Sequence, residues 1–258
     1  MESRMPYSVA REAADAFLAE AGKFFSRVEV AGSIRRLRPT CKDVDVVGIM
    51  ADAKGLSAWI NDNADREAPP GTPDTFKFIA GRTAVSVEGR ASTRFFWKGV
   101  EYDLWLTSER RFAMILLVRT GPNRGRGVEG PGDPGALMNQ SLATRAIRQG
   151  KSFKVSGSIY VKSTKQELFF DTEEEAFKAL WLPYCPPEWR DHPDWIALIW
   201  SDKRVGGGFW IPGQNAPYQE AATFEERSRL RREAWARLPE EERKARAAQD
   251  MVDLFGEV

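Results

Sequence analysis

The first part of the chain alternates between the hydrophobic period of a helix and that of β-strands. Small and apolar residues recur at helical spacing between Ser8 and Gly22, which predicts a helix that Ser8 caps and Gly22 ends. Two runs rich in β-branched residues, 27–31 and 43–49, predict strands. Helical spacing returns over 56–60. The pattern therefore indicates a domain built from both helices and strands.

Four further segments in the middle of the chain are rich in β-branched and aromatic residues. They predict strands over 76–80, 84–88, 94–97 and 100–106. A helix is predicted over 109–119. This order of elements favours an α+β fold, in which helices flank a mixed β-sheet.

A segment rich in glycine and proline, 121–135, breaks the pattern and predicts a flexible loop. Helical spacing resumes over 137–149. A Ser-Gly-Ser turn between two short apolar runs, 153–155 and 159–161, predicts a β-hairpin. The next helix is predicted to begin after Thr172, whose hydroxyl caps it. The remaining sequence is first rich in tryptophan and then in arginine and glutamate, which predicts a helical extension.

Composition limits the chemistry that the chain can perform. Its 258 residues carry a net charge of +1, one histidine and two cysteines. These counts exclude a His-rich metal site and a disulfide framework, and they leave oxygen atoms as metal ligands. There is no apolar run of membrane-spanning length and no secretory signal at the start. We expect an intracellular protein, cytoplasmic or nucleoid-associated, that is neither secreted nor bound to a membrane.

Three aspartates supply candidate oxygen ligands. Asp43 and Asp45 begin one predicted strand, where side chains at i and i+2 point to the same side. Asp103 lies on another predicted strand and shares a face with Glu101 and Trp105. Mg²⁺ prefers a few carboxylates together with phosphate oxygens and water, and a pair of such ions promotes phosphoryl-type transfer. The aspartates therefore predict a two-metal site.

A phosphate-binding turn is predicted directly before the first two aspartates. Gly32 and Ser33 open a short helical turn whose N–H groups attract anions, and Arg36 can add a bidentate contact to phosphate. Pro39 ends the turn. The alternative is that the arginines form a solvated face and that the aspartates are turn and strand-edge residues, because Asp-x-Asp alone is a common pattern.

These motifs together resemble those of the family X DNA polymerases, the DNA polymerase beta group. The resemblance begins with Gly-Ser-x-Arg-Arg at 32–36 and Asp-x-Asp at 43–45, and it includes Asp103 ahead of Leu-Trp-Leu. As a set the motifs are specific, although each one alone is common.

The resemblance continues into the second half of the chain. Thr120-Gly121 matches the Thr-Gly turn that lies under the incoming sugar in that family, and Asn139 falls where the family has a nucleotide-contacting asparagine. The segment 171–190 looks like the family's C-terminal helix and tail. In all, the resemblance covers roughly residues 8–190.

Several site residues follow from the resemblance. It implies that Asp43, Asp45 and Asp103 are catalytic and hold two Mg²⁺ ions, for which Mn²⁺ can substitute. The nucleotide-binding residues that it implies are Gly32, Ser33, Arg36, Thr120, Gly121 and Asn139. The implied reaction adds dNMP from a dNTP to the 3′-OH of a DNA primer on a template, or of a DNA end, and releases pyrophosphate. We expect this activity to serve DNA repair and gap filling.

The resemblance implies two regions along the chain, and the composition of the remaining sequence predicts a third. Residues 1–118 would form a nucleotidyltransferase palm, and 119–190 a thumb-like nucleotide- and DNA-binding subdomain that carries the loop 121–135. Residues 191–258 would form the helical, Arg- and Glu-rich extension. Basic residues on the thumb are candidates for contacts to DNA phosphates, and the alternative is a solvated helix face. These candidates are Arg145, Arg148, Lys151 and Lys154.

Three places depart from the family's pattern. Val118-Arg119 replaces the aromatic pair before Thr-Gly, and Ala143 replaces an arginine that helps to read the template. Glu101 stands where the family has an arginine two residues before the third aspartate. Outside the site, the tryptophans at 195, 200 and 210 are expected to pack in a core rather than to stack on bases.

Two other functions fit part of the pattern. A nucleotidyltransferase that acts on RNA, a protein or a small molecule shares the Gly-Ser…Asp-x-Asp core but does not need the thumb-like segment. A non-catalytic module that binds DNA ends would need only the basic residues. The motifs point to dNTP and DNA as partners and identify no protein partner.

Overall fold

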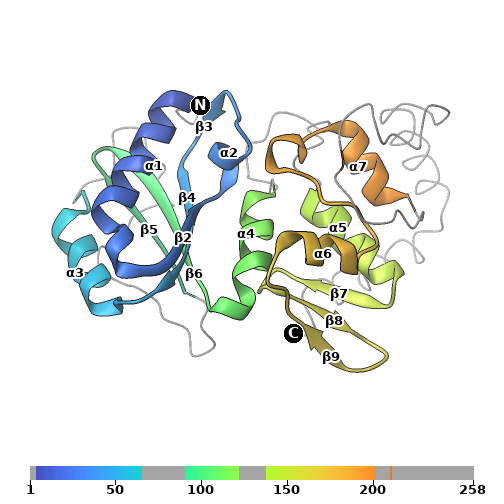
Figure 1. Cartoon of the computed structure of the whole chain (residues 1–258). Helices are drawn as coiled ribbons and strands as arrows, with labels where there is room; N and C mark the ends of the chain where they lie inside the picture. The colour runs from blue at the N-terminus through green and yellow to red at the C-terminus, as the bar shows by residue number, and fades with distance from the viewer. Residues whose placement is uncertain (1–3, 66–90, 122–137, 202–209, 211–258) are drawn as a thin grey trace, which may run out of the picture. The chain divides into compact units, whose positions relative to one another are not determined.

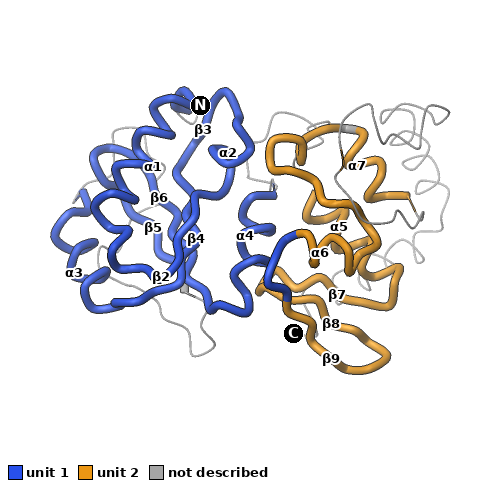
Figure 2. Tube along the Cα trace, in the orientation of Figure 1, with its two compact units in different colours: residues 1–121, 170–173 blue, residues 122–169, 174–258 orange. Residues whose placement is uncertain are grey.

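The computed structural model describes residues 4–65, 91–121, 138–201 and 210. They belong to two compact units, shown in Figure 2: residues 1–121 with 170–173, and residues 122–169 with 174–258. Each unit combines helices with a β-sheet, so the fold is mixed α+β. None of the described helices is long and apolar enough to cross a membrane.

The first unit contains a four-stranded sheet, a two-stranded ribbon and helices on both faces of the larger sheet (Figure 1). Its elements in chain order are β1 (Met5–Pro6), α1 (Tyr7–Ala21), the 3-10 helix η1 (Gly22–Phe24), β2 (Phe25–Val30), α2 (Gly32–Arg35), β3 (Thr40–Cys41), β4 (Val44–Met50), α3 (Ala53–Asn63), β5 (Ala91–Trp97), β6 (Val100–Leu106), the 3-10 helix η3 (Glu109–Arg111) and α4 (Phe112–Thr120).

The order of strands in the larger sheet is β2-β4-β6-β5. The central pair, β4 and β6, is parallel, and the two outer pairs are antiparallel. β5 and β6 are joined by a two-residue turn, Lys98-Gly99, whose φ angles of 52° and 77° are both positive. Two positive φ angles are typical of a type I′ turn, which matches the twist of a β-hairpin. The turn length therefore fixes the register of β5 on β6.

The alternation of side chains along β4 and β6 divides the sheet into two faces. On one face, Phe17 of α1 packs among aromatic rings of the sheet, with ring centroids 5.4 Å from Tyr102 and 6.2 Å from Phe95. On the other face, Val47 packs with Phe112 and other apolar residues of α4. Figure 1 shows α1 and α3 on the first face and α4 on the second. The first face holds the larger hydrophobic core, and the second face carries the polar residues of the site.

The second unit is built on a three-stranded antiparallel sheet, β7-β8-β9. Its elements are α5 (Met138–Arg148), β7 (Lys151–Lys154), β8 (Ser158–Val161), β9 (Gln166–Leu168), α6 (Glu173–Ala179, whose first residue is grouped with the first unit), the 3-10 helix η5 (Pro187–Trp189) and α7 (Pro193–Trp200).

Aromatic side chains form the core of the second unit. Trp195 and Trp210 are buried, with ring centroids 5.6 Å apart, and Phe177 lies 5.4 Å from Trp195. The expectation that these two tryptophans pack in a core is confirmed. Trp200, at the end of α7, is partly exposed and lies next to Arg148.

Most of the predicted elements in the described residues are present. The predicted strand 100–106 and the β7–β8 hairpin are confirmed. The helix predicted over 56–60 is longer, because Asp52 caps it by accepting a hydrogen bond from the Gly55 N–H. The third strand of the second sheet, β9, was not predicted, since its residues are mostly polar and exposed and lack strand alternation.

Some predicted elements lie outside the described residues. They are the strands at 76–80 and 84–88, the loop 121–135 after its first residue, and the charged extension beyond 210.

Candidate active site

The structure brings Asp43, Asp45 and Asp103 together on the α4 face of the first unit's sheet. β4 pairs with β6 in parallel, and Asp45 is the direct neighbour of Asp103 in this pairing. Asp43 lies two residues before Asp45, just ahead of β4. The intervening Val44 is buried on the opposite face, in the core against α1. Asp43 and Asp45 therefore share a face of the sheet, as their spacing predicts. The parallel pairing of β4 with β6 places the carboxylate of Asp103 beside them.

Two of the three carboxylates, Asp43 and Asp45, have raised pKa values. Burial raises the pKa of Asp45 well above its ordinary value, and the charges of Asp43 and Asp103 raise it further. Burial also raises the pKa of Asp43, with the charge of Asp103 as the next cause. Arg36 and Arg119 oppose the shift at Asp45. A divalent cation would relieve this repulsion, so the chemistry of the carboxylates fits Mg²⁺.

The guanidinium of Arg94 is hydrogen-bonded to Asp103. Arg94 of β5 is the direct partner of Asp103 in the β5–β6 pairing, and its Nε and Nη2 donate hydrogen bonds to the two oxygens of the Asp103 carboxylate. As they stand, the described side chains of Asp, Glu, His and Cys include no group of three or more arranged to hold a metal ion. The set of ligands is therefore chemically suitable, but one of its members is paired with an arginine.

Gly32 lies in direct contact with this acidic site. Its φ is +59°, a conformation that favours glycine, and a Cβ at this position would lie 2.0 Å from Oδ2 of Asp45. The N–H of the preceding Ala31 donates a 2.8 Å hydrogen bond to the carbonyl oxygen of Asp45. The turn that carries Ser33 is thus held against the strand that carries the carboxylates.

Two arginines of this turn bind the end of α4. Nη1 of Arg36 donates to the carbonyl oxygen of Thr120 at 2.6 Å, and Nη1 of Arg35 donates to the Thr120 hydroxyl at 2.9 Å. Arg35 also forms a bidentate pair with Glu173, at 2.9 and 2.8 Å. Gly121 follows Thr120 as the C-cap of α4. The predicted nucleotide-binding residues of the first unit therefore form one connected cluster.

Arg119 adds a further positive charge near the aspartates. Its Cζ lies 3.2 Å from the ring centroid of Trp105, so its guanidinium is held against the indole. Burial lowers the pKa of Arg119, while the charges of Asp45 and Asp103 act in the opposite direction. The position that departs from the family's aromatic pair thus places a cation, not a ring, beside the carboxylates.

Most of the second unit's described residues belong to a segment that resembles a known protein family. Residues 137–191 match the family model described as DNA polymerase beta thumb. This segment relates the chain to the family X DNA polymerases. No curated protein matches the chain. The thumb match includes α5, the three-stranded sheet and α6, and it ends before α7.

The thumb contains Asn139 and the four basic residues that were candidates for binding DNA. Asn139 is buried in the first turn of α5. Arg145 is also buried, with 4% of its surface exposed. Its guanidinium donates hydrogen bonds to backbone carbonyls that follow α6 and end α7. The acceptors are the carbonyl oxygens of Leu180, Trp181, Leu198, Ile199 and Ser201.

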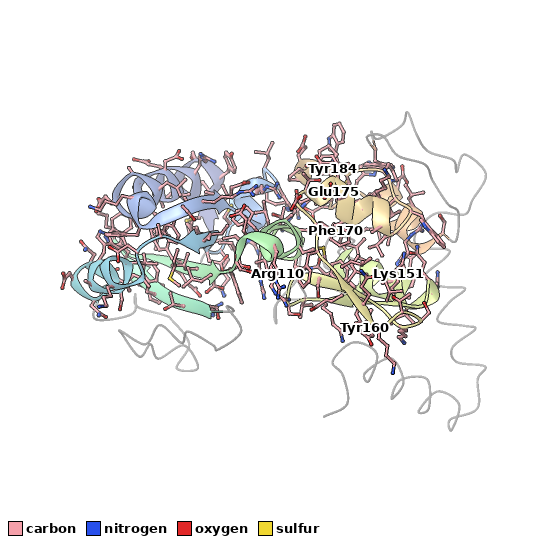
Figure 3. The ribbon with its side chains drawn as sticks, turned by 60° about the horizontal axis from the view of Figure 1, so that its bottom comes forward. Arg110, Lys151, Tyr160, Phe170, Glu175 and Tyr184 are labelled. Carbon is pink, nitrogen blue, oxygen red and sulfur yellow. The ribbon has the colours of Figure 1, made fainter. Side chains whose placement is uncertain are left out.

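Arg145 is buried, whereas the other three basic candidates are exposed or partly exposed. Its hydrogen bonds tie α5 to α7 and to the end of α6, so a phosphate contact would require it to leave those carbonyls. Lys151 is half-buried, donates to the carbonyl oxygen of Ala179 at 2.6 Å, and has a pKa lowered by burial. Arg148 is exposed, and Lys154 is partly exposed above the ring of Tyr160. Figure 3 labels Lys151 and Tyr160 on the strands of the thumb sheet.

Three residues of the site had not been predicted for the roles that the structure gives them. The sequence pattern does not indicate a role for Arg94 or Glu173, and it marks Arg119 only as a departure from the family's pattern. The two-residue turn Lys98-Gly99 lies between two strand-like runs. Its length sets the pairing of β5 with β6, and this pairing places Arg94 opposite Asp103. The pairing of Arg35 with Glu173 joins residues 138 positions apart, and no local pattern indicates it.

Proposed function

We propose that the protein is a nucleotidyltransferase that adds dNMP to the 3′-OH of DNA and releases pyrophosphate, in DNA repair or gap filling. One observation carries the proposal: a cluster of three aspartates, flanked by Arg36 and Arg119, lies in the same chain as a segment that matches the DNA polymerase beta thumb. The aspartates suit phosphoryl transfer, and the thumb match favours DNA as the acceptor.

Each group of residues has a role in this proposal. Asp43, Asp45 and Asp103 would hold two Mg²⁺ ions, which when bound lower the pKa of the attacking hydroxyl and neutralise the triphosphate. Ser33 and Arg36 would bind phosphate oxygens, because a hydroxyl and a guanidinium both donate to them. Gly32, Thr120 and Gly121 would add nucleotide contacts in the first unit. Asn139, in the second unit, is assigned a nucleotide contact by the thumb match alone.

The electrostatics of the first unit support this assignment. Asp43 and Asp45 both have raised pKa values because they are buried close to like charges. Burying like charges close together costs stability. Groups with pKa values perturbed in this way are therefore enriched at functional sites. The surrounding arginines, Arg35, Arg36 and Arg119, give the same region the positive charge that a triphosphate requires.

We further propose a palm over 1–118, a thumb over 119–190 and an extension over 191–258, whose first helix, α7, packs in the core of the second unit. Contacts to DNA phosphates are assigned to Arg148, Lys151 and Lys154. Arg145 is given a structural role instead, because it is buried and its guanidinium donates to five carbonyl groups. Arg148 and Lys151 each donate to a backbone carbonyl as well, but they are more exposed. Such phosphate contacts would make DNA binding depend on salt concentration.

Primer extension tests the function. The purified chain should extend a labelled primer on recessed or gapped DNA with dNTPs and Mg²⁺ or Mn²⁺, and Asp103→Asn should lose turnover while still binding DNA. Asp15→Asn is the matched control, because Asp15 is an exposed aspartate of α1 paired with Arg11. No incorporation by the wild-type protein with either metal would refute the polymerase proposal.

The same assay separates the alternatives. Extension of an RNA primer, or labelling of a protein or small molecule in place of DNA, would assign the same site to another acceptor. Unchanged function of an Asp43→Asn/Asp45→Asn variant in every assay would favour the non-catalytic DNA-end module.

A further inference from the structure

Arg94 contacts two carboxylates of the same strand. Its guanidinium donates to both oxygens of Asp103, its direct partner across the β5–β6 pairing. Its Nε also lies 3.1 Å from Oε1 of Glu101, two residues earlier on β6 and therefore on the same face. The side chains of Asp103 and Glu101 are only 11% and 12% exposed. Arg94 thus contacts one buried acid, Asp103, and one partly buried acid, Glu101.

The pairing with Asp103 competes with metal binding. A carboxylate whose two oxygens both accept hydrogen bonds from a guanidinium offers few lone pairs to a cation, and charge-assisted bidentate pairs are strong. In the described part of the chain no three acids are arranged to hold an ion, although Asp45 and Asp103 are register neighbours. The ion and the guanidinium therefore need the same oxygens.

Glu101 is a second carboxylate with which Arg94 can pair. If Arg94 releases Asp103, it need not be left without an acid, since Glu101 is already at 3.1 Å. Among the described residues, Lys42 is a second cation near Glu101, with its Nζ 3.9 Å from Oε2 of Glu101. The loss of the pair with Asp103 is thus partly offset by a closer pair with Glu101, which lowers the cost of freeing the aspartate.

We propose that Arg94 is a positioning residue that holds Asp103 until a divalent cation binds and then pairs with Glu101. This inference rests on the proposed function in one respect, namely that Asp103 is a metal ligand. It goes further by assigning Arg94 and Glu101 opposite effects on metal affinity. Arg94 competes with the cation for Asp103, whereas Glu101 favours the cation by drawing Arg94 away.

Calorimetric titration of the full chain with Mn²⁺ tests the inference without measuring turnover. Arg94→Gln should bind Mn²⁺ at least about tenfold more tightly than the wild type, because the competitor is gone. Glu101→Gln should bind it at least about threefold more weakly, because Arg94 then loses the carboxylate to which it could move from Asp103. Arg94→Lys, which keeps the charge but cannot form the bidentate pair, should fall between Arg94→Gln and the wild type.

Lys98→Gln is the control for the loss of one positive charge. Lys98 lies in the turn of the same hairpin, is exposed and pairs with Glu20, far along the strand from Asp103. Its Mn²⁺ affinity should equal that of the wild type. Thermal melting of each variant identifies those that fail to fold, and the conservative Arg94→Lys then serves in place of Arg94→Gln.

The outcomes distinguish this inference from the proposed function. If the wild-type protein binds Mn²⁺ and Asp103→Asn does not, Asp103 is a ligand. Equal affinities of the Arg94 and Glu101 variants would then overturn the inference alone, as would shifts of the same sign. If the wild-type protein binds no Mn²⁺ even with dNTP present, the metal assignment fails and the inference fails with it.

Discussion

Asp45 and Asp103 are side-by-side neighbours in the parallel pairing of β4 with β6, and both point toward α4. The register of β4 on β6 therefore brings together two acids that are far apart in the sequence. It also places them in a partly buried setting where their charges repel. The arrangement favours ligand binding at the expense of stability.

Replacement of Asp45 by Asn should stabilise the metal-free protein. The pKa of Asp45 is raised in the folded protein, so the unfolded chain loses its proton more readily and stability falls as the pH rises through the raised pKa. Removing the charge should increase Tm by about 2–4 °C at neutral pH. Below the ordinary pKa of aspartate, ~3.9, both states are protonated and the two proteins should melt alike.

Thermal melts at neutral and acidic pH, with and without Mg²⁺, check this expectation. Mg²⁺ should raise the Tm of the wild type but not that of Asp45→Asn, because the variant has lost a ligand. A lower Tm for the metal-free variant at neutral pH would show that Asp45 stabilises the fold, contrary to the electrostatic argument.

Replacement of Gly32 by Ala should damage the site more than the fold. The new methyl group would overlap the Asp45 carboxylate and displace it, and displacements of about 1 Å can reduce turnover about 100-fold. Gly99→Ala is the matched control, since Gly99 also has a positive φ, +77°, but a Cβ there meets nothing within 4 Å. Both variants carry a backbone cost of about 1–2 kcal/mol.

The comparison is made by primer extension at a temperature where both variants are folded. Gly32→Ala should lose kcat and Gly99→Ala should retain it. Equal losses in the two variants would attribute the effect to backbone strain, not to contact with Asp45.

Arg145 and Arg148, one turn apart on α5, should respond differently to replacement by Ala. Arg145→Ala removes one donor from each of five carbonyl groups inside the thumb and should cost about 3 kcal/mol or more of unfolding free energy. Arg148→Ala removes an exposed side chain and should change stability by less than about 1 kcal/mol.

For DNA affinity we expect the opposite: replacement of Arg148 should have the larger effect and replacement of Arg145 the smaller. Arg148→Ala should weaken binding and reduce the slope of log K against log salt by about 1, as expected for one lost phosphate contact. Denaturant melts and binding titrations at several salt concentrations provide the two readouts. A stable Arg145→Ala protein with a reduced salt slope would assign Arg145 to DNA after all.

The pair Arg35–Glu173 should contribute a measurable coupling energy. The two side chains are 19% and 6% exposed and share two hydrogen bonds, at 2.9 and 2.8 Å. A double-mutant cycle with Arg35→Gln and Glu173→Gln should give a coupling of about 1–3 kcal/mol in unfolding free energy. The exposed pair Arg11–Asp15 offers the comparison and should give less than about 0.5 kcal/mol. Equal values for the two cycles would contradict the importance of burial.

The sequence was informative where structure depends on local periods. The strand over 100–106 and the shared face of Asp43 and Asp45 follow from alternation, and the thumb hairpin follows from its Ser-Gly-Ser turn. Alternation along 100–106 also predicts that Asp103 shares a face with Glu101 and Trp105. In each case neighbouring residues in the chain determine the direction of the side chain.

The sequence was less informative where structure depends on distant contacts. Arg145 has the spacing of an exposed helical residue, but carbonyl groups at the ends of α6 and α7 bury it. Glu173 reaches Arg35 from a segment that returns to the first unit after the thumb sheet. These contacts depend on how elements pack, which periodicity within one element does not encode.

The Lys98-Gly99 turn, remote from the acids, determines which residue meets Asp103. Adding one residue to this turn would slip β5 by one position, and every side chain of β5 would change face. Arg94 would then point into the core around Phe17, and an apolar or hydroxyl side chain would face the aspartate. Relatives of this chain that keep Arg94 should therefore vary in the sequence of the turn but not in its length.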